Sequence, residues 1–365
     1  MATAQRPRLI VLDSMSLIHR AYHAVPRNYA TSTGELTNAV FGFANMLLRI
    51  VDEIEPDHAV AAFDLPGPTF RDEIYDSYKA NREAPDDELI AQFGRVRQLV
   101  NALGIPVFEL PSYEADDMLG TIARQAEEVG FDVWLVTGDR DAFQLVTQHV
   151  RVLSTNPKTG APLVYDEAAV VERWGIRPAQ VVDFKGLLGD TSDNIPGVKG
   201  VGEKTAAALL SAYEDIDEIY ANLDDVKPAV RRRLEGQQEF AQLSRNLATI
   251  VCDVPVQFEP QKAKLWQPDS EAVRSLFQEL EFRNLADRLT FLDGSEPEPV
   301  FALPNVAPKI IDDTAEARAL VQQLMDAERV SIFPCVRSSA GVDELLGLAV
   351  AWTDETAYIR SLPVE

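Results

Sequence analysis

The sequence predicts an α/β protein, with a mostly parallel central sheet covered by helices on both faces, followed by a helical region and an incomplete α/β segment. Short apolar runs that end in a carboxylate, such as LIVLD at 9–13 and AVAAFD at 59–64, alternate with helical stretches over the first 170 residues. Strands that alternate with helices are typical of a parallel sheet with helices on both faces. From about residue 170 onward the pattern is helical.

The elements of the core follow from apolar spacing and from turn residues. Apolar residues three and four apart predict a helix over 37–54, and Pro66-Gly67-Pro68 breaks the chain after the second strand. Ser112 is expected to cap the helix that starts at that residue. In chain order we expect strands at 8–13, 58–64, 105–110 and 131–138, helices at 37–54, near 89–103 and at 112–130, and a closing hairpin of 150–155 with 162–166.

Four segments are expected along the chain. The α/β core occupies 1–170 and a helical subdomain occupies 171–292. Residues 293–307 are rich in Pro and acid and are expected to form a linker. Residues 308–365 predict a helix at 314–327 and two strands, VSIF and ELLGLAVAW, which is too little sheet for a finished domain. We therefore expect the chain to end inside a domain.

The composition limits the cellular context but not the partner. A formal net charge of −24 is unlike a nucleic-acid binder, since phosphate affinity comes from Lys and Arg. Binding depends on the local face, however, and bound metal would neutralise many acids. No apolar run reaches the length of a membrane span, and the N-terminus leads directly into a strand. Cys252 and Cys335 match no metal or redox spacing, so a cytoplasmic location is expected.

Nine carboxylates stand where strands and helices are expected to end. The carboxyl ends of parallel strands form the ligand crevice of an open sheet, so these acids are expected to converge. Two carboxylates about 5 Å apart repel by roughly 3 kcal/mol at an effective dielectric of about 20, so a large cluster needs cations. Oxygen ligands without His or Cys favour Mg²⁺ or Mn²⁺, which predicts a two-metal phosphodiester enzyme. The acids are Asp13, Asp64, Glu114, Asp116, Asp117, Asp139, Asp141, Asp190 and Asp193.

Each acid taken alone also has a structural interpretation. Acids in the first turn of a helix are favoured by its dipole. Asp139 and Asp141 could form a solvated turn, and Asp190 could cap a helix. Against this, Glu114 and Asp117 are three residues apart on one helix face, where like charges repel unless a metal binds. The convergence of all nine in one crevice favours the metal site.

Two further segments carry groups suited to phosphates. GVKGVGEKTA at 197–206 predicts a tight Gly turn between helices, whose backbone N–H groups suit a phosphate, although it could simply connect the helices. A polar segment after Asp64 carries basic and aromatic residues at helical spacing, which could bind phosphates and stack on unpaired bases or form a solvated helix face. Arg20 and Tyr22 follow Asp13 closely enough to reach the same crevice. The residues of the polar segment are Arg71, Tyr75, Tyr78, Lys79 and Arg82.

Five blocks in series carry a family resemblance: VLDSMSLIHRAYHA, AAFDLPGPTFRDEIYDSYKANR, YEADDMLGTIA, TGDRDAFQL and GLLGDTSDNIPGVKGVGEKTA. Over roughly residues 8–290 the chain resembles the 5′-nuclease domain of bacterial DNA polymerase I, in the flap endonuclease family. The resemblance implies a PIN- or Rossmann-like core, a helical arch at about 66–100 and a helix–hairpin–helix element at about 184–213. It implies 5′-3′ exonuclease or structure-specific 5′-flap endonuclease activity on DNA, within a polymerase used in replication and repair. Expected partners are flapped, nicked or 5′-ended duplex DNA, with no membrane, no nucleotide cofactor and a monomeric chain.

The resemblance also implies roles for individual residues. One Mg²⁺ or Mn²⁺ would lie among Asp13, Asp64, Glu114 and Asp116, and a second among Asp139, Asp141, Asp190 and Asp193, with Asp117 near both. Lys79 and Arg82 would contact the scissile phosphate and, with Asp116, are the expected catalytic residues. Tyr78 would stack on a base, and a K⁺ ion could bind at the hairpin turn. The expected DNA contacts are Arg20, Tyr22, Arg71, Tyr78, Lys79, Arg82, Lys199, Gly200, Gly202, Lys204 and Thr205.

The C-terminal part, 308–365, resembles the start of a 3′-exonuclease-like domain. Active members of that family carry an Asp-x-Glu pair at the end of the first strand, where this chain has Phe333-Pro334-Cys335-Val336. We therefore predict a degenerate domain without proofreading activity. No polymerase domain is present in these 365 residues.

Two other functions remain open from the sequence. A PIN-like ribonuclease shares the acids at strand ends, but the arch-like segment and the hairpin suit a flapped duplex better. A non-catalytic DNA-junction binding module would have no use for nine repelling acids. A phosphatase with an aspartyl nucleophile is excluded, because it needs D-x-D after the first strand and the chain has Asp13-Ser14-Met15.

Overall fold

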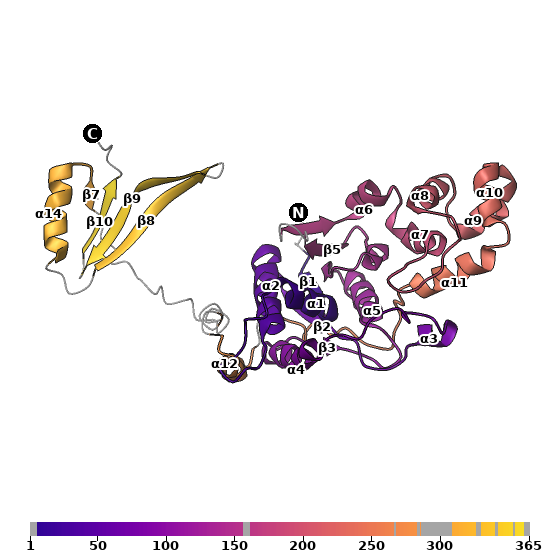
Figure 1. Cartoon of the computed structure of the whole chain (residues 1–365), viewed down its shortest axis with the longest axis horizontal. Helices are drawn as coiled ribbons and strands as arrows, with labels where there is room; N and C mark the ends of the chain where they lie inside the picture. The colour runs from indigo at the N-terminus through magenta and orange to yellow at the C-terminus, as the bar shows by residue number, and fades with distance from the viewer. Residues whose placement is uncertain are drawn as a thin grey trace. The chain divides into compact units, whose positions relative to one another are not determined.

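The central sheet has six strands in the order β3-β2-β1-β4-β5-β6. Figure 1 labels β1, β2, β3 and β5 of this sheet. The computed structural model describes residues 6–155, 161–265, 268–282, 285, 309–325, 330–339, 342–352 and 355–360. The first five strands are parallel and β6 is antiparallel to β5, which confirms the predicted sheet and its closing hairpin. The strands are β1 (Arg8–Asp13), β2 (His58–Ala62), β3 (Val107–Phe108), β4 (Asp132–Val136), β5 (Val150–Thr155) and β6 (Pro162–Tyr165).

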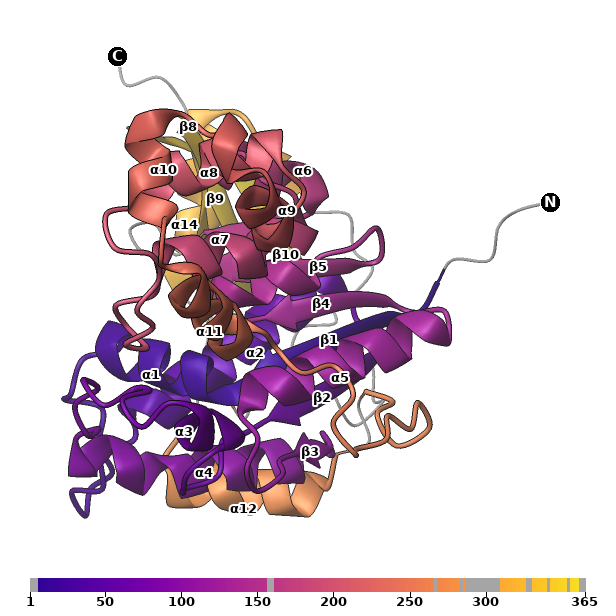
Figure 2. The same cartoon turned by 90° about the vertical axis from the view of Figure 1, so that its right-hand side faces the viewer.

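Helices cover both faces of this sheet because its strands are apolar on both sides. In β1, Leu9 and Val11 join one core, whereas Ile10 and Leu12 join the other. The first core includes α5 (Ala115–Glu128), which runs alongside β1 and β2 in Figure 2. The second core is formed with α1 (Ser14–Ala24), α2 (Asn38–Ile54), α4 (Asp87–Ala102) and α12 (Ser270–Glu279).

The helical region extends the core on the α5 side. Buried residues of this region, among them Leu209, Ile216 and Ala241, belong to the same apolar cluster as Leu9 and Val11. Residues 1–293 accordingly form one compact unit, without a break in the core near residue 170. The helices are α6 (Glu167–Trp174), α7 (Val181–Leu188), α8 (Glu203–Ala212), α9 (Ile216–Ala221), α10 (Pro228–Leu234) and α11 (Gln238–Ala248), with short 3₁₀ turns at Asp141–Leu145, Pro178–Gln180 and Leu223–Asp225.

Three local predictions are wrong. The helix after β3 does not begin at Ser112, which has a left-handed φ of 71°; Glu114 is the N-cap and Asp117 accepts its backbone N–H. The predicted strand at 105–110 is reduced to the two residues of β3. The basic and aromatic residues after Asp64 do not share a helix, because α3 ends at Ile74 (Phe70–Ile74) and turns follow.

Residues 294–365 form a second compact unit. Its four strands lie in the order β7-β10-β9-β8, and α14 (Thr314–Met325) confirms the predicted helix to within two residues. The strands are β7 (Lys309–Ile311), β8 (Val330–Ser339), β9 (Val342–Trp352) and β10 (Glu355–Arg360). The predicted linker at 293–307 lies outside the described residues. Among the residues that are described, no helix is long and apolar enough to cross a membrane.

Candidate active site

A cleft of about 940 Å³ opens at the carboxyl ends of the central strands, and eight of the nine predicted acids line it. Parallel strands direct their carboxyl ends to one edge, and the strand order reverses between β1 and β4, which is where an open α/β sheet forms its ligand crevice. The eight acids are Asp13, Asp64, Glu114, Asp116, Asp139, Asp141, Asp190 and Asp193.

Backbone groups at the strand ends fix several of these acids. Asp13 ends β1 and caps α1, where its Oδ1 accepts a hydrogen bond from the Ser16 backbone N–H at 3.0 Å. Its Oδ2 accepts a hydrogen bond from the Thr137 hydroxyl, just after β4, at 2.6 Å. Asp64 follows β2 and its Oδ1 accepts the backbone N–H of Ala115, the first residue of α5, at 2.7 Å. The cleft therefore joins the ends of β1, β2 and β4 to the start of α5.

One half of the cleft holds acids without basic partners. Within the described residues, Asp13, Asp64, Asp116 and Asp139 form no ion pair with Lys, Arg or His. Burial, together with the charges of Asp64 and Asp139, raises the pKa of Asp13 to about 6. Burial and the neighbouring Asp139, Asp13 and Asp64 raise the pKa of Asp116 well above its ordinary value. Burial is the largest cause of both pKa shifts and the neighbouring carboxylates add to it, so a bound cation would stabilise the charged forms.

Three basic side chains hold the acids of the other half. The Lys79 ammonium lies 2.6 Å from Glu114 Oε1, and Arg82 pairs with Asp193. Lys185 bridges Asp141 and Asp190. Lys79 adopts a left-handed φ of 53°, and its backbone N–H donates to the Asp193 carbonyl at 2.9 Å. Such a strained backbone persists only when its surroundings hold it, which here fixes the lysine over the cleft.

The balance of contacts differs between the two acids beside Lys185. Burial and Asp139 raise the pKa of Asp141 to about 7, and Lys185 only partly offsets them. Although burial acts in the opposite direction, hydrogen bonds from Lys185 and Ser192 lower the pKa of Asp190. Sequence reasoning missed Lys185. Its signal was a lysine on the helix that leads into the Asp190 loop, five residues before that acid.

Asp117 and Arg71 are not where the prediction required them. Asp117 has no exposed surface and Arg71 is 2% exposed, so neither can meet an ion in the cleft or DNA outside it. Instead they form a bidentate ion pair, with both N–O distances 2.8 Å. The carboxylate faces the interior because one step along α5, from Asp116 to Asp117, rotates the side-chain direction by about 100°. The assignment of Asp117 to the metals, and of Arg71 to DNA, is therefore corrected.

Two predicted aromatic contacts are also corrected. Tyr22 is 2% exposed, and its hydroxyl donates to Asp86 at 2.9 Å. Tyr78 is 5% exposed and packs against Leu247, while its hydroxyl donates to Glu114 at 3.1 Å. Buried rings cannot stack on a base. Arg20, by contrast, lines the cleft, as do Lys79 and Arg82.

The predicted Gly turn lies between α7 and α8, outside the cleft. Lys199, Gly200, Gly202 and Lys204 are exposed and Thr205 is partly exposed, so this hairpin presents backbone and ammonium groups to solvent. Gly197 has a φ of 61°, and a Cβ there would lie 2.3 Å from the Gly189 nitrogen, which explains why only glycine fits. Arg233 of α10 donates to the Gly200 carbonyl at 2.8 Å and supports the turn.

The chemistry of the cleft fits hard divalent cations, although its present geometry is open. All the acids offer oxygen ligands, which suit Mg²⁺ or Mn²⁺. As the side chains stand, no three or more of the described acids, His or Cys are arranged to hold an ion. Lys79, Arg82 and Lys185 pair with four of these acids, Glu114, Asp193, Asp141 and Asp190.

Two family models match adjacent parts of the chain. Residues 8–175 match the model of the 5′-3′ exonuclease N-terminal resolvase-like domain, and residues 176–271 match the 5′-3′ exonuclease C-terminal SAM fold. DNA polymerase I of Chloroflexus aurantiacus is 48% identical over 280 residues, which cover 76% of this chain and 30% of that protein. DNA polymerase I of Caldicellulosiruptor bescii is 38% identical over 325 residues, 87% of this chain and 38% of that protein. The chain thus spans about a third of the length of these relatives.

Solved structures support the fold. The T5 5′-exonuclease with bound divalent metal ions aligns with a TM-score of 0.55 at 20% identity, over 78% of this chain and 99% of that one. The catalytic core of Rad2 in complex with a DNA substrate aligns with a TM-score of 0.54 at 16% identity, over 79% of this chain and 93% of that one. At these identities the alignments establish the α/β core with its helical extension. The two matched domain models show that the chain belongs to the 5′-3′ exonuclease family of nucleases.

Proposed function

We propose that this chain hydrolyses DNA phosphodiesters by a two-metal mechanism, as a 5′-3′ exonuclease and structure-specific 5′-flap endonuclease. The observation that carries the proposal is the cleft itself, which is lined by eight of the predicted carboxylates together with Lys79, Arg82 and Lys185. A protein that only bound DNA would gain nothing from acids that repel both one another and the phosphate. In the relatives' context, the domain would serve a DNA polymerase I in replication and repair.

Two Mg²⁺ or Mn²⁺ ions would be held by acids from different elements. We assign the first to Asp13, Asp64, Glu114 and Asp116, and the second to Asp139, Asp141, Asp190 and Asp193, with Asp117 excluded. Bound there, the ions would supply an activated water and stabilise the leaving oxygen.

The basic residues would act on the phosphate. Lys79, Arg82 and Lys185 are each paired with acids of the cleft, so binding of cations by those acids would release their charges toward substrate. Lys79 and Arg82 would then neutralise charge that develops on the phosphoryl oxygens. Arg20, on the same wall as Asp13, would bind an adjacent phosphate.

The hairpin between α7 and α8 would grip duplex DNA at a distance from the chemistry. Its exposed backbone N–H groups and the side chains of Lys199, Lys204 and Thr205 suit sugar–phosphate contacts, and a K⁺ ion on its carbonyls would strengthen them. Residues 66–100 would form the arch over a single 5′ strand. Among the similar structures, T5 5′-exonuclease has bound zinc, a T5 flap endonuclease variant is in complex with DNA and metal ions, and Rad2 is in complex with a DNA substrate, which supports metal and DNA as ligands.

The remaining assignments follow the relatives. We propose that the chain acts as a monomer in the bacterial cytoplasm on flapped, nicked or 5′-ended duplex DNA, and needs no nucleotide cofactor. The unit after residue 293 would be a degenerate 3′-exonuclease-like domain. Its strand β8 carries VSIFPCVRSS, without a carboxylate for a metal.

The test is cleavage of a 5′-end-labelled 5′-flap DNA in Mg²⁺, with EDTA and an equal-length single-stranded RNA as comparisons. We expect a short product cut at the junction, abolished by EDTA. Flap binding without cleavage in Mg²⁺ or Mn²⁺ would favour a junction-binding module, and preferential cutting of the RNA would favour a PIN-like ribonuclease.

A further inference from the structure

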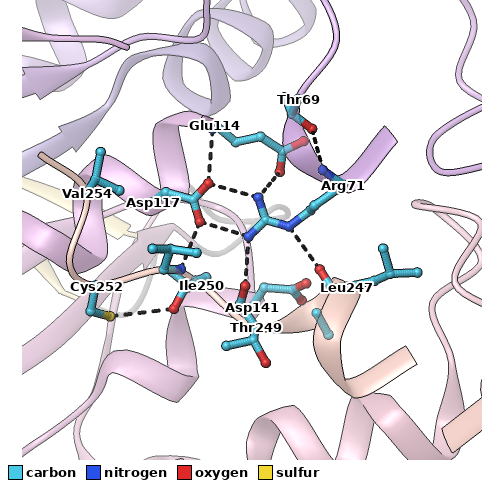
Figure 3. Close-up of polar contacts among 12 residues, drawn as sticks. Thr69, Arg71, Glu114, Asp117, Asp141, Leu247, Thr249, Ile250, Cys252 and Val254 are labelled. Carbon is cyan, nitrogen blue, oxygen red and sulfur yellow. Dashed lines mark hydrogen bonds and ion pairs between the residues drawn. The ribbon is translucent and has the colours of Figure 1, made fainter. Parts of the chain in front are cut away.

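The buried pair of Arg71 and Asp117 lies at the junction of three parts of the molecule. Arg71 comes from α3, at the base of the polar segment, and Asp117 comes from α5, which carries the cleft acid Asp116 and is capped by the cleft acid Glu114. Figure 3 shows the guanidinium between Asp117 and the end of α11, where the backbone carbonyls of Leu247 and Thr249 accept its remaining hydrogen bonds at 3.0 and 2.7 Å. Arg71 thus satisfies a carboxylate and two orphan carbonyls of a helix C-terminus at once.

Asp117 completes the junction from the other side. Its Oδ1 accepts the backbone N–H of Val251 at 2.9 Å, and its Oδ2 accepts the backbone N–H of Glu114 at 3.1 Å. Together with the two hydrogen bonds from Arg71, these contacts use all the lone pairs of the buried Asp117 carboxylate. A carboxylate with this complement of donors has no capacity left for an ion.

Glu114 of the cleft is the residue that this junction holds. Asp117 fixes its backbone, and Arg71 Nη1 lies 3.4 Å from its Oε2. The Tyr78 hydroxyl, whose ring packs on Leu247 of α11, donates to the same carboxylate. The C-terminal end of α11 is therefore connected to Glu114 through the side chains of Arg71 and Tyr78.

The other end of this connection is the hairpin. Ser244, in the middle of α11, has no exposed surface and accepts the backbone N–H of Gly197 at 2.9 Å. A continuous set of contacts thus runs from the hairpin through Ser244 and α11 to Arg71, Asp117 and Glu114. We infer that Arg71 and Asp117 are positioning residues that set the carboxylate of Glu114 relative to the hairpin, and that they touch neither metal nor DNA.

This inference rests on the proposed function, in which Glu114 binds a metal and the hairpin binds duplex. A displacement of a catalytic group by about 1 Å can cost roughly 100-fold in rate. Loss of the pair should therefore lower the cleavage rate without removing a ligand or a DNA contact.

The experiment compares Arg71→Lys, Asp117→Asn and the double variant in the full chain. The readouts are single-turnover cleavage of the flap DNA, Mn²⁺ binding followed by electron paramagnetic resonance, DNA affinity in Ca²⁺, and the melting temperature. Arg245→Lys is the matched control, because Arg245 lies on α11 and pairs with the buried Asp183 and with Asp217 rather than with an acid of the cleft.

We expect each single variant to cleave about 10- to 100-fold more slowly, with DNA affinity unchanged within about twofold. The double variant should be no slower than the slower single variant, because the two residues act as one unit. Their effects on Mn²⁺ affinity should match one another, since both act through Glu114. Arg245→Lys should lower the melting temperature to a similar extent and leave the cleavage rate unchanged.

Other results would overturn the inference. A loss of Mn²⁺ affinity in Asp117→Asn that exceeds that of Arg71→Lys by about tenfold would return Asp117 to the metal ligands. Weaker DNA binding by Arg71→Lys alone would make Arg71 a DNA contact. An equal loss of cleavage rate in Arg245→Lys would show that Arg71 and Asp117 contribute only to the stability of the fold. Asp116→Ala distinguishes the proposed catalytic site from the proposed positioning role. Cleavage by Asp116→Ala would refute the catalytic site. An inactive Asp116→Ala together with a fully active Arg71→Lys would refute only the positioning role.

Discussion

Asp116 and Asp117 are adjacent on α5, yet they belong to two regions that tolerate negative charge in opposite ways. Asp116 faces the cleft, where burial and other acids raise its pKa and no described basic side chain pairs with it. Asp117 has no exposed surface and is satisfied by Arg71 and two backbone N–H groups. At 3.6 residues per turn, one step along the helix turns a side chain by about 100°. The buried pair is electrostatically complete, whereas Asp116 in the cleft has no basic partner among the described residues.

The largest expected difference is between the effects of Asp116→Asn and Asp117→Asn on the flap-cleavage rate and on the melting temperature. Asp116→Asn should reduce flap cleavage by about a thousandfold or more, and should raise the melting temperature in EDTA because it removes repulsion. Asp117→Asn should lower that temperature, since breaking a buried ion pair costs about 3–5 kcal/mol. Thermal melts in EDTA and single-turnover rates test both. Shifts of melting temperature in the same direction would contradict the distinction between the two regions.

The next effect concerns the basic side chains of the cleft. Lys79→Ala should slow single-turnover cleavage by about 100-fold, because charge on the transferring phosphoryl group loses a preorganised partner. Flap affinity in Ca²⁺ should change much less. Lys262→Ala is the control, since Lys262 is exposed and, among the described residues, pairs with the surface residue Glu259. An unchanged rate for Lys79→Ala would remove this lysine from the reaction.

The cleft should also make stability depend on pH in the absence of divalent cations. The pKa of Asp13 is about 6 and that of Asp141 about 7, both raised mainly by burial above the ordinary 3.8. The folded state therefore binds protons more tightly than the unfolded state, so this contribution is fully present below about pH 4 and is lost as the pH rises through 6 to 7.

In EDTA the melting temperature should accordingly rise as the pH falls from about 8 to about 5.5. Asp141→Asn should weaken that rise, and saturating Mg²⁺ should flatten it, because metal-bound carboxylates stay ionised. Differential scanning fluorimetry across buffers is sufficient. A melting temperature that decreases as the pH is lowered over this range would exclude net repulsion among the carboxylates of the cleft.

The smallest expected effect lies at the hairpin. Lys204→Ala should weaken binding to duplex DNA without sequence preference and reduce the slope of log K against log salt by about 1. Cleavage of bound substrate should be unchanged. Fluorescence anisotropy at several salt concentrations measures this, with Lys262→Ala again as control. If affinity and slope both match the parent chain, Lys204 makes no phosphate contact.

Some site residues could not be found from sequence because their partners are distant in the chain. Asp117 was predicted to bind metal, since like charges at 114 and 117 seemed to need a cation; Arg71, 46 residues away, supplies the charge instead. Lys185 reaches Asp141, 44 residues away, across the junction of the core and the helical region. Periodicity reports which face of an element is apolar, but not which element will cover it.

The sequence by itself determined the order of strands and helices along the chain, because apolar periodicity is a local property. It also determined that the acids at strand ends converge, because parallel strands place their carboxyl ends at one edge of the sheet. It determined the hairpin as well, since glycines at 197 and 200 permit the positive φ that the turn uses. Only the tertiary structure decided which acids face the cleft and which are satisfied inside. That choice depends on a helix rotation of about 100° per residue and on long-range partners such as Arg71 and the end of α11.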